Sequence, residues 1–170
     1  MTAPAIELKG ISKAFGPVQA NKDISILVQP GTIHGIIGEN GAGKSTLMRI
    51  IYGNYLAAGG SVVVGGVDVT QSEPRDILKL RREVLGYVSQ FLRVVPRVPT
   101  IEVVAEPLLS LGTPMDEAKD RAASLLQKLN IPEPLWSLSP TTFSGGEQQR
   151  VNIARGFAHS YPALLLDEPT

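Results

Sequence analysis

The sequence contains no cysteine, and this absence excludes several kinds of chemistry at once. Disulfide bonds, thiolate zinc sites, iron–sulfur clusters and cysteine nucleophiles all require that residue. The chain also has no excess of either charge, because 16 Lys and Arg residues balance 16 Asp and Glu residues. Without a strong positive field, binding to the phosphates of nucleic acid is disfavoured, so we expect no nucleic-acid partner.

Long apolar runs are missing as well. No segment approaches the roughly 18 consecutive apolar residues that a membrane span needs. The opening residues, Met-Thr-Ala-Pro-Ala-Ile-Glu, have neither the basic region nor the apolar region of a signal peptide. We therefore expect a soluble protein of the cytoplasm.

The composition is that of a folded protein. The 170 residues suit one medium-sized domain or a piece of a larger protein. Hydrophobic residues make up 43% of the chain and charged residues 19%, which is typical of globular rather than disordered sequences. The 17 glycines and 13 prolines fall between short apolar segments, and this punctuation indicates a mixture of strands and helices.

Hydrophobic periodicity predicts where those elements lie. Strands are expected at residues 6–9, 24–28, 32–37, 61–64, 67–69, 84–89 and 163–166. Helices are expected at residues 44–52, 73–82, 100–111, 114–129 and 144–159. Apolar strands that alternate with helices predict an α/β fold with a parallel sheet around residues 32–52 and 84–168. Residues 92–143 are interpreted as a helical insertion in that sheet.

Two local details accompany these elements. Thr113 is expected to cap the helix at 114–129, with Asp116 three residues later completing a variant of the capping box. His34 falls inside the expected strand 32–37 and is interpreted as a packed structural residue.

The segment Gly38-Glu-Asn-Gly-Ala-Gly-Lys-Ser45 fits the pattern G-x-x-x-x-G-K-[ST] of a phosphate loop. Its glycines, at 38, 41 and 43, allow backbone N–H groups to surround phosphate oxygens. Lys44 would place a cation on the β- and γ-phosphates, and the hydroxyl of Ser45 can ligate Mg²⁺. Because the match lies between an apolar strand and a helix, we interpret it as a nucleotide site rather than as a glycine-rich turn.

Two carboxylates follow the last apolar strand, at Asp167 and Glu168. Successive side chains of a strand point to opposite faces, so the two acids are expected to have different roles. Asp167 would hold Mg²⁺, and Glu168 would orient and polarise an attacking water. Taken alone the pair could be a solvated strand end, but together with the phosphate loop it is interpreted as a ligand site.

A second glycine-rich turn, Phe143-Ser-Gly-Gly-Glu147, precedes the helix at 144–159. Since one nucleotide does not need two such helix ends from one chain, Ser144 and Gly146 are candidates for the γ-phosphate of a nucleotide on a partner subunit. The alternative is an ordinary serine helix cap followed by flexible glycines.

These three motifs together resemble the ATP-binding-cassette (ABC) ATPases, and the resemblance covers essentially all 170 residues. Phe-Ser-Gly-Gly-Glu stands where the family signature is Leu-Ser-Gly-Gly-Gln. The resemblance implies a P-loop NTPase fold with a RecA-like parallel sheet core, an N-terminal antiparallel β subdomain and a helical insertion. It assigns residues 1–31 and 53–72 to the antiparallel part, residues 32–52, 84–91 and 144–170 to the core, and residues 92–143 to the helical part.

The resemblance also implies site residues. Gln90 matches the glutamine that touches Mg²⁺ and water, and Phe15 matches the aromatic that stacks on adenine. Glu147 departs from the family's glutamine and is expected to pair with Arg150. The expected catalytic residues are Glu168, Gln90 and Lys44, and the expected metal ligands are Ser45, Gln90 and Asp167. The expected nucleotide contacts are Phe15, Gly38, Glu39, Asn40, Gly41, Ala42, Gly43, Lys44, Ser45, Thr46, Ser144, Gly145, Gly146 and Glu147.

Two branches of the family match different parts of the chain. Residues 6–52 resemble the ATPases of sugar and nucleoside importers. Residues from about 84 onward, including Gly86-Tyr-Val-Ser-Gln-Phe-Leu-Arg-Val-Val-Pro-Arg97, resemble an ABC-type subunit of the phosphonate carbon–phosphorus lyase system. The partner implied by the second match is a phosphonate-degrading assembly, and the partner implied by the first is a membrane permease.

The family continues beyond the acidic pair with a further strand that ends in a histidine. That strand belongs between the phosphate-loop strand and the strand of Asp167 and Glu168. Its absence from the sequence predicts an N-terminal fragment of a chain of about 220–260 residues.

The implied function is an ATPase with ATP and Mg²⁺ as cofactors, working as a head-to-tail dimer that drives a partner. The chain would lie in the cytoplasm, attached to the inner membrane if the partner is a permease. Two other classes stay open: a nucleotide-binding module that does not hydrolyse ATP, and a small-molecule P-loop kinase, which the Ser-Gly-Gly turn argues against.

Overall fold

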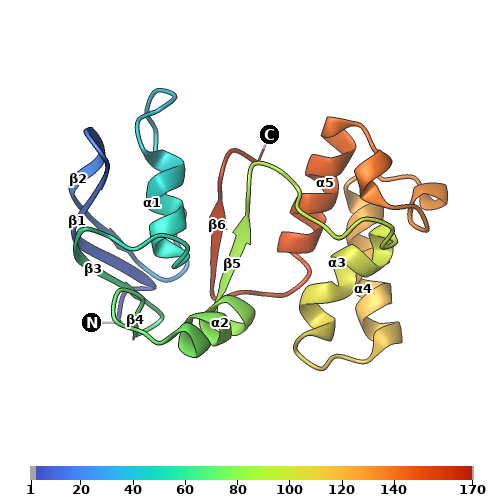
Figure 1. The fold of residues 1–170 in the computed structure, drawn as a ribbon. Helices are drawn as coiled ribbons and strands as arrows, with labels where there is room; N and C mark the ends of the chain where they lie inside the picture. Colours follow the sequence, from blue (N-terminus) through green and yellow to red (C-terminus); the bar gives the residue numbers. More distant parts are fainter. Residues whose placement is uncertain (1–2, 170) are drawn as a thin grey trace. The chain divides into compact units, whose positions relative to one another are not determined.

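The computed structural model describes residues 3–169 of the chain (Figure 1). The chain divides into two compact units, Met1–Leu85 and Gly86–Thr170. Each unit has its own set of buried apolar side chains. Within residues 3–169, no helix combines the length and apolar character that crossing a membrane would require.

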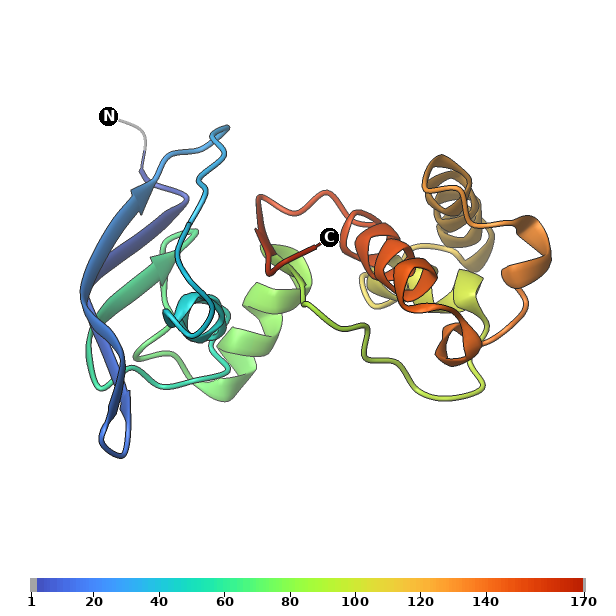
Figure 2. The ribbon, with the colours of Figure 1, turned by 90° about the horizontal axis from the view of Figure 1, so that it is seen from above.

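The first unit is built on a four-stranded antiparallel sheet with the strand order β2-β1-β3-β4. Helix α1 lies against one face of this sheet (Figures 1 and 2) and buries Leu47, Ile50 and Ile51. Val62 and Val64 of β3 are both buried because alternate side chains of a strand share one face. The elements are β1 (Ile6–Phe15), β2 (Val18–Val28), α1 (Lys44–Ile51), β3 (Gly59–Val64), β4 (Val67–Asp68) and α2 (Pro74–Glu83).

The hairpin between β3 and β4 turns through Gly65 and Gly66, whose φ angles are 54° and 83°. Positive φ at both central residues is the requirement of a type I′ turn, which matches the twist of the flanking strands. The predicted hairpin at 61–69 is therefore present.

The expected strand at residues 32–37 is absent, and this prediction is wrong. Ile33 and Ile37 are 101% and 98% exposed, and His34 is exposed too. A strand needs neighbours that accept its N–H groups and donate to its C=O groups. None of the described strands pairs with residues 32–37, so the apolar side chains of this segment have no sheet face to cover, and His34 is not packed.

The second unit combines three packed helices with a strand pair. Strands β5 (Leu85–Val88) and β6 (Ala163–Leu166) pair with each other and run in the same direction (Figure 1). Helices α3 (Thr100–Leu109), α4 (Met115–Lys128) and α5 (Gly145–Gly156) share one apolar cluster. Short 3₁₀ turns, η1 (Glu133–Leu135) and η2 (Pro140–Thr142), connect α4 to α5.

The caps of α4 and α5 differ from each other. The predicted Thr113 cap of α4 is wrong, because Pro114 occupies the cap position and no side chain caps this helix. The N–H of Thr113 instead donates to the carbonyl of Leu108 at 3.1 Å, which closes the turn after α3. Helix α5, in contrast, begins with a complete capping box formed by Ser144 and Glu147.

Candidate functional site

The phosphate-loop segment leads directly into α1 in the first unit. Gly41 and Gly43 adopt the left-handed conformation, with φ of 86° and 81°, and Gly43 is the N-cap of α1. Gly38 has no positive φ, but a Cβ there would lie 3.3 Å from the Cβ of Ala42. The backbone therefore needs glycine at 41 and 43 for conformation and has little room for a side chain at 38.

The ammonium group of Lys44 closes the loop. Its Nζ donates to the carbonyl of Gly38 at 2.7 Å and to the carbonyl of Glu39 at 2.9 Å. Glu39 and Asn40 are exposed at the tip of the loop, while Ser45 and Thr46 are half-buried in the first turn of α1. This arrangement sets a cation and the positive end of an eight-residue helix beside an exposed loop, which is suited to an anion.

Phe15 lies at the end of β1 and is 46% exposed. Its ring meets the ring of Tyr55 edge-on at 5.7 Å, and the ammonium of Lys13 lies 5.2 Å from its centroid. Arg49 holds Tyr55 in turn, with Nη1 donating to the phenol oxygen at 3.0 Å. The sequence analysis missed Tyr55, and nothing in its local pattern marks it as a neighbour of Phe15.

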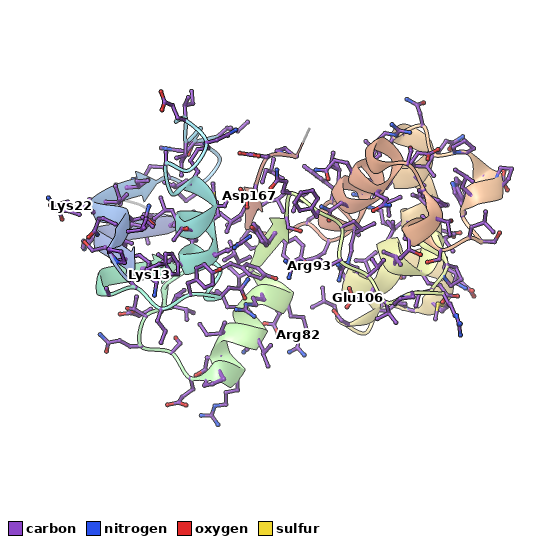
Figure 3. The ribbon with its side chains drawn as sticks, turned by 45° about the horizontal axis from the view of Figure 1, so that its top comes forward. Lys13, Lys22, Arg82, Arg93, Glu106 and Asp167 are labelled. Carbon is purple, nitrogen blue, oxygen red and sulfur yellow. The ribbon has the colours of Figure 1, made fainter. Side chains whose placement is uncertain are left out.

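The two acids at the end of β6 occupy different environments. Asp167, labelled in Figure 3, is 4% exposed. Its Oδ2 accepts a hydrogen bond from the hydroxyl of Tyr87 at 2.7 Å. Its backbone N–H donates to the carbonyl of Val88 at 2.9 Å, so β5 holds this residue by two bonds. Glu168 is exposed and has a positive φ of 51°, a strained conformation for a residue with a side chain.

Gln90 and Glu168, two of the predicted site residues, lie together. The side-chain amide of Gln90 donates to Oε2 of Glu168 at 3.0 Å. The contact follows from the pairing of β5 with β6, because Gln90 and Glu168 each come two residues after the end of their strand. Sequence reasoning missed Tyr87, because the pairing of β5 with β6 brings its hydroxyl to Asp167 and no local pattern marks that pairing.

The carboxylate of Glu147 binds the turn that precedes α5. Oε2 of Glu147 accepts from the backbone N–H of Ser144 at 2.9 Å and from its hydroxyl at 2.6 Å, and the N–H of Glu147 donates back to the Ser144 Oγ at 3.4 Å. Hydrogen bonding by the side chain and then the backbone of Ser144 lowers the pKa of Glu147, with a smaller contribution from the charge of Arg150.

The expected pairing of Glu147 with Arg150 is wrong as a contact. No ion pair joins the two side chains among the described residues, because the carboxylate is turned toward the helix N-terminus. Gly145 and Gly146 form the first helical residues after Ser144. The signature segment is therefore a helix N-terminus whose serine is already engaged by a carboxylate of the same chain.

The predicted metal ligands are of a kind that suits Mg²⁺. Carboxylate, hydroxyl and amide oxygens are hard ligands, and Mg²⁺ retains several waters, so it does not need many protein ligands. Ser45 belongs to the first unit, and Gln90 and Asp167 belong to the second. Within residues 3–169, no group of three or more His, Cys, Asp or Glu side chains is arranged to hold a metal ion.

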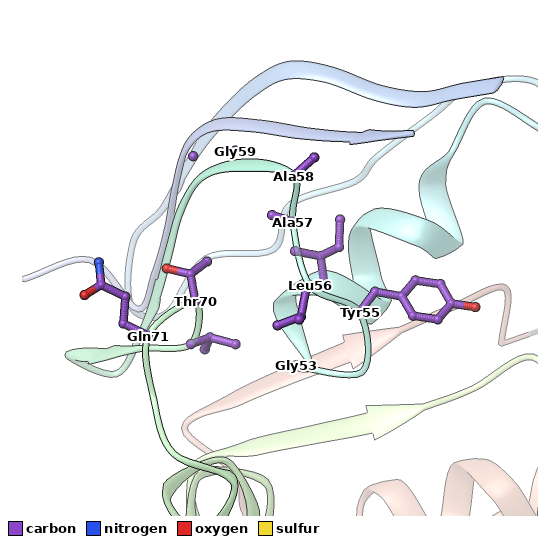
Figure 4. Close-up of a pocket in the computed structure, with 11 residues that line it drawn as sticks. Gly53, Tyr55, Leu56, Ala57, Ala58, Gly59, Thr70 and Gln71 are labelled. Atoms are coloured by element: carbon purple, nitrogen blue, oxygen red, sulfur yellow. The ribbon is translucent and has the colours of Figure 1, made fainter. Parts of the chain in front are cut away.

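A pocket of about 290 Å³ in the first unit contains none of the predicted site residues (Figure 4). It lies between the end of α1 and the start of β3 and includes Tyr55, Leu56 and Gly59. Its position separates it from the phosphate loop along α1, because the loop leads into the opposite end of that helix.

Comparison with known proteins identifies the family. A family described as "ABC transporter" matches residues 21–170. The chain belongs to the ABC transporter family. Two solved structures of the bacterial ABC transporter cassette MJ0796 align with TM-scores of 0.91 and 0.89, each at 30% identity and covering 97% of this chain and 74% of the other. Both are described as dimeric, and one is described as bound to ADP and Pi. The P-loop NTPase cassette fold predicted from the sequence is thereby confirmed.

Curated relatives carry several transport descriptions. The methionine import ATP-binding protein MetN of Cereibacter sphaeroides is 39% identical over 99% of this chain, which spans 49% of that relative. The lipoprotein-releasing system ATP-binding protein LolD of Hyphomonas neptunium is 34% identical over 100% of this chain, which spans 76% of it. The macrolide export protein MacB of Sodalis glossinidius is 37% identical, and the chain spans 26% of its length.

Proposed function

We propose that this chain is the nucleotide-binding part of an ABC ATPase, which binds Mg·ATP and hydrolyses it to drive a partner. The observation that carries the proposal is the phosphate loop, in which Gly43 caps α1 and the Lys44 ammonium lies on the loop carbonyls. An arriving phosphate replaces those carbonyls as the partner of Lys44, because a charged acceptor forms the stronger hydrogen bond. Phe15 offers an exposed ring for the adenine base.

The acids of the second unit complete the proposed chemistry. Asp167, Ser45 and Gln90 would hold Mg²⁺, which when bound neutralises charge on the phosphates. Glu168 is exposed and accepts a hydrogen bond from Gln90, so both side chains are available to orient a water for attack on the γ-phosphate. The buried Asp167 and the exposed Glu168 support separate roles for the two carboxylates.

We assign Ser144 and Gly146 to the nucleotide of a second subunit, in a head-to-tail dimer. The dimeric descriptions of the two similar cassettes support this arrangement. In the present structure the Ser144 hydroxyl contacts Glu147, so a phosphate would have to share Ser144 with that carboxylate or displace it. A kinase would have no use for this helix end, whereas a dimeric ATPase would.

Equilibrium binding tests the proposal directly. Isothermal titration should show Mg²⁺-dependent binding of ATP to the protein, and Lys44→Ala should weaken it by at least tenfold because a cation on the phosphates is lost. Lys22→Ala, an exposed lysine on β2, is the matched control and should bind as the unmodified protein does. Absence of Mg²⁺-dependent binding, or an unaffected Lys44→Ala variant, would overturn the proposal.

Phosphate release separates an ATPase from a binding module. With the complete protein, Glu168→Gln should retain ATP binding and slow phosphate release by about 100-fold or more, the usual effect of losing a general base. Equal and slow release from both proteins would favour a module that uses ATP only for assembly. Transfer of phosphate to a small acceptor instead of water would favour a kinase.

The partner is proposed to dock on the segment after Gln90. Phe91 and Val95 are each 70% exposed there, and Arg93 and Arg97 are exposed beside them.

The described relatives favour a membrane permease as the partner, since they are named for import, release and export. A phosphonate-degrading partner is supported only by the resemblance of residues from 84 onward, and a sugar or nucleoside importer only by residues 6–52. Co-purification with a permease or with phosphonate-degrading enzymes would decide between them.

A further inference from the structure

Strand β2 carries an irregularity beside the phosphate loop. Lys13 of β1 faces Asn21, whereas the next residue, Ala14, faces Gln19. Ala20 is therefore an extra residue on β2 without a partner position on β1, which makes this a β-bulge. A bulge removes a carbonyl from the regular ladder and redirects the neighbouring side chains, and bulges are frequent next to binding sites.

The last glycine of the phosphate loop lies directly against this bulge. A Cβ at Gly43 would be 2.1 Å from the carbonyl oxygen of Ala20 and 2.9 Å from Nδ2 of Asn21. No side chain fits at that separation, so the loop backbone and the β2 backbone are in direct contact. Gly43 is required here by close approach as well as by its positive φ.

Asn21 connects the two segments. Its Nδ2 donates to the carbonyl of Gly43 at 3.2 Å, and the same carbonyl accepts from the N–H of Leu47 at 2.9 Å in the first turn of α1. The residue is only 7% exposed, and its Oδ1 has no hydrogen-bond partner among the described residues. An apolar residue would fill this place without leaving a buried acceptor unpaired. Stability alone therefore does not account for an asparagine at this position.

The bond to Gly43 acts on the next residue. The carbonyl of Gly43 and the N–H of Lys44 belong to one planar peptide group and point in opposite directions. Asn21 draws the carbonyl toward β2, and this turns the Lys44 N–H away from β2. That N–H belongs to the first turn of α1, where helix N–H groups have no partner within the helix and where the proposed phosphate would bind.

We propose that Asn21 is a positioning residue for phosphate binding, which fixes the orientation of the Gly43–Lys44 peptide from its place beside the β2 bulge. The inference rests on the proposed nucleotide site. According to this proposal, a residue of β2 that lies outside the phosphate-loop motif contributes to the affinity for the nucleotide. The ligand chemistry concerned is the polyphosphate chain, not the base.

The variant Asn21→Leu removes the donor and keeps the number and branching of the side-chain heavy atoms, and Asn21→Ala is the second variant in case the larger leucine prevents folding. Losing one hydrogen bond should weaken ATP binding by about 3- to 10-fold. Inorganic tripolyphosphate should lose affinity by the same factor, because the effect acts on phosphates. The amide resonance of Lys44 should shift in the free protein, as seen by ¹H–¹⁵N NMR.

Val62→Ala is the matched control. Val62 is fully buried in the same sheet, so its truncation lowers stability without changing the Asn21 bond, and it should leave both affinities and the Lys44 resonance unchanged. Folded Asn21 variants that bind ATP and tripolyphosphate as tightly as the unmodified protein would overturn the inference. If the unmodified protein itself binds neither ligand, the proposed function fails instead, so the two failures are distinct.

Discussion

At the scale of single residues, the carboxylate of Glu147 competes with the proposed phosphate for the hydroxyl of Ser144. This carboxylate satisfies the N–H of Ser144 and also binds the serine hydroxyl, which stabilises the start of α5 in the manner of a capping box. The same hydroxyl is the group that we assign to a phosphate of a second subunit. A glutamine would keep the shape of this contact without its negative charge.

The lowered pKa of Glu147 gives a pH-dependent prediction. A carboxyl group whose pKa is depressed by folding stabilises the protein above its unfolded pKa, near 4.5, and this contribution disappears as the pH falls through the lower folded value. The thermal midpoint of the unmodified protein should therefore exceed that of Glu147→Gln at pH 7, and the difference should shrink between pH 5 and pH 3. A difference that does not change with pH would contradict this reading of the cap.

A second prediction concerns the stability that the hydrogen bond from Tyr87 to the buried Asp167 contributes. Tyr87→Phe removes a hydrogen bond of 2.7 Å to a carboxylate that is 4% exposed. The free energy of unfolding should fall by about 1.5–3 kcal/mol, the range for hydrogen bonds to charged groups. Denaturant unfolding measures the loss. In an Asp167→Asn background the same substitution should have a smaller effect, and equal effects in both backgrounds would show that the bond contributes little.

Sequence reasoning named Gln90, Asp167 and Glu168 but could not measure their separations. The contact between Gln90 and Glu168 joins residues 78 positions apart and depends on the pairing of β5 with β6. The role proposed for Asn21 was not predicted because it depends on a bulge, and a bulge leaves no local composition signal. Glu147 was assigned to Arg150 by helical spacing, whereas the helix N-terminus offered it closer donors.

At the scale of elements, the helices were predicted well and the strands less so: the strand at 32–37 is absent, and β1 and β2 extend well beyond the predicted segments 6–9 and 24–28. The periodicity and glycine pattern of α1 are local, so its start at Lys44 and its buried residues Leu47, Ile50 and Ile51 agree with the sequence. The segment 32–37 has the same apolar character as a buried strand, but a strand is stable only with partners. Periodicity reports which face a segment would bury and does not report whether a partner is present.

The close packing of α5 on β5 can be tested with one methyl group. A Cβ at Gly156 would lie 2.2 Å from Cγ2 of Val88. Gly156 is the last residue of α5, so alanine gains at most about the 1 kcal/mol of a helix interior there, but overpacking costs about 1–3 kcal/mol. Gly156→Ala should therefore lower the free energy of unfolding by about 1 kcal/mol in denaturant titration.

Val88→Ala is the matched partner for that experiment, because it removes the group that the new methyl meets. The double variant Gly156→Ala, Val88→Ala should be more stable than the sum of the two single losses predicts. Simple additivity of the two losses would mean that α5 moves away from β5 at no cost, and the packing argument would fail.

At the scale of the whole molecule, the proposed site draws on both units. The phosphate loop belongs to Met1–Leu85, and Asp167 and Glu168 belong to Gly86–Thr170. If one Mg·ATP is held by residues of both, ligand binding stabilises the units together, by about 2.7 kcal/mol at 100 times the dissociation constant.

This linkage predicts which amides are protected from hydrogen exchange when the ligand binds. Hydrogen exchange of amides in α1 and in α5 should slow together when Mg·ATP is added, because opening either unit then releases the ligand. With Asp167→Ala, ATP should still protect α1 through the phosphate loop and should no longer protect α5. Removal of Mg²⁺ with a chelator should reproduce that pattern in the unmodified protein. Protection of α1 alone in the presence of Mg·ATP would show that the carboxylates and the phosphate loop do not share one nucleotide.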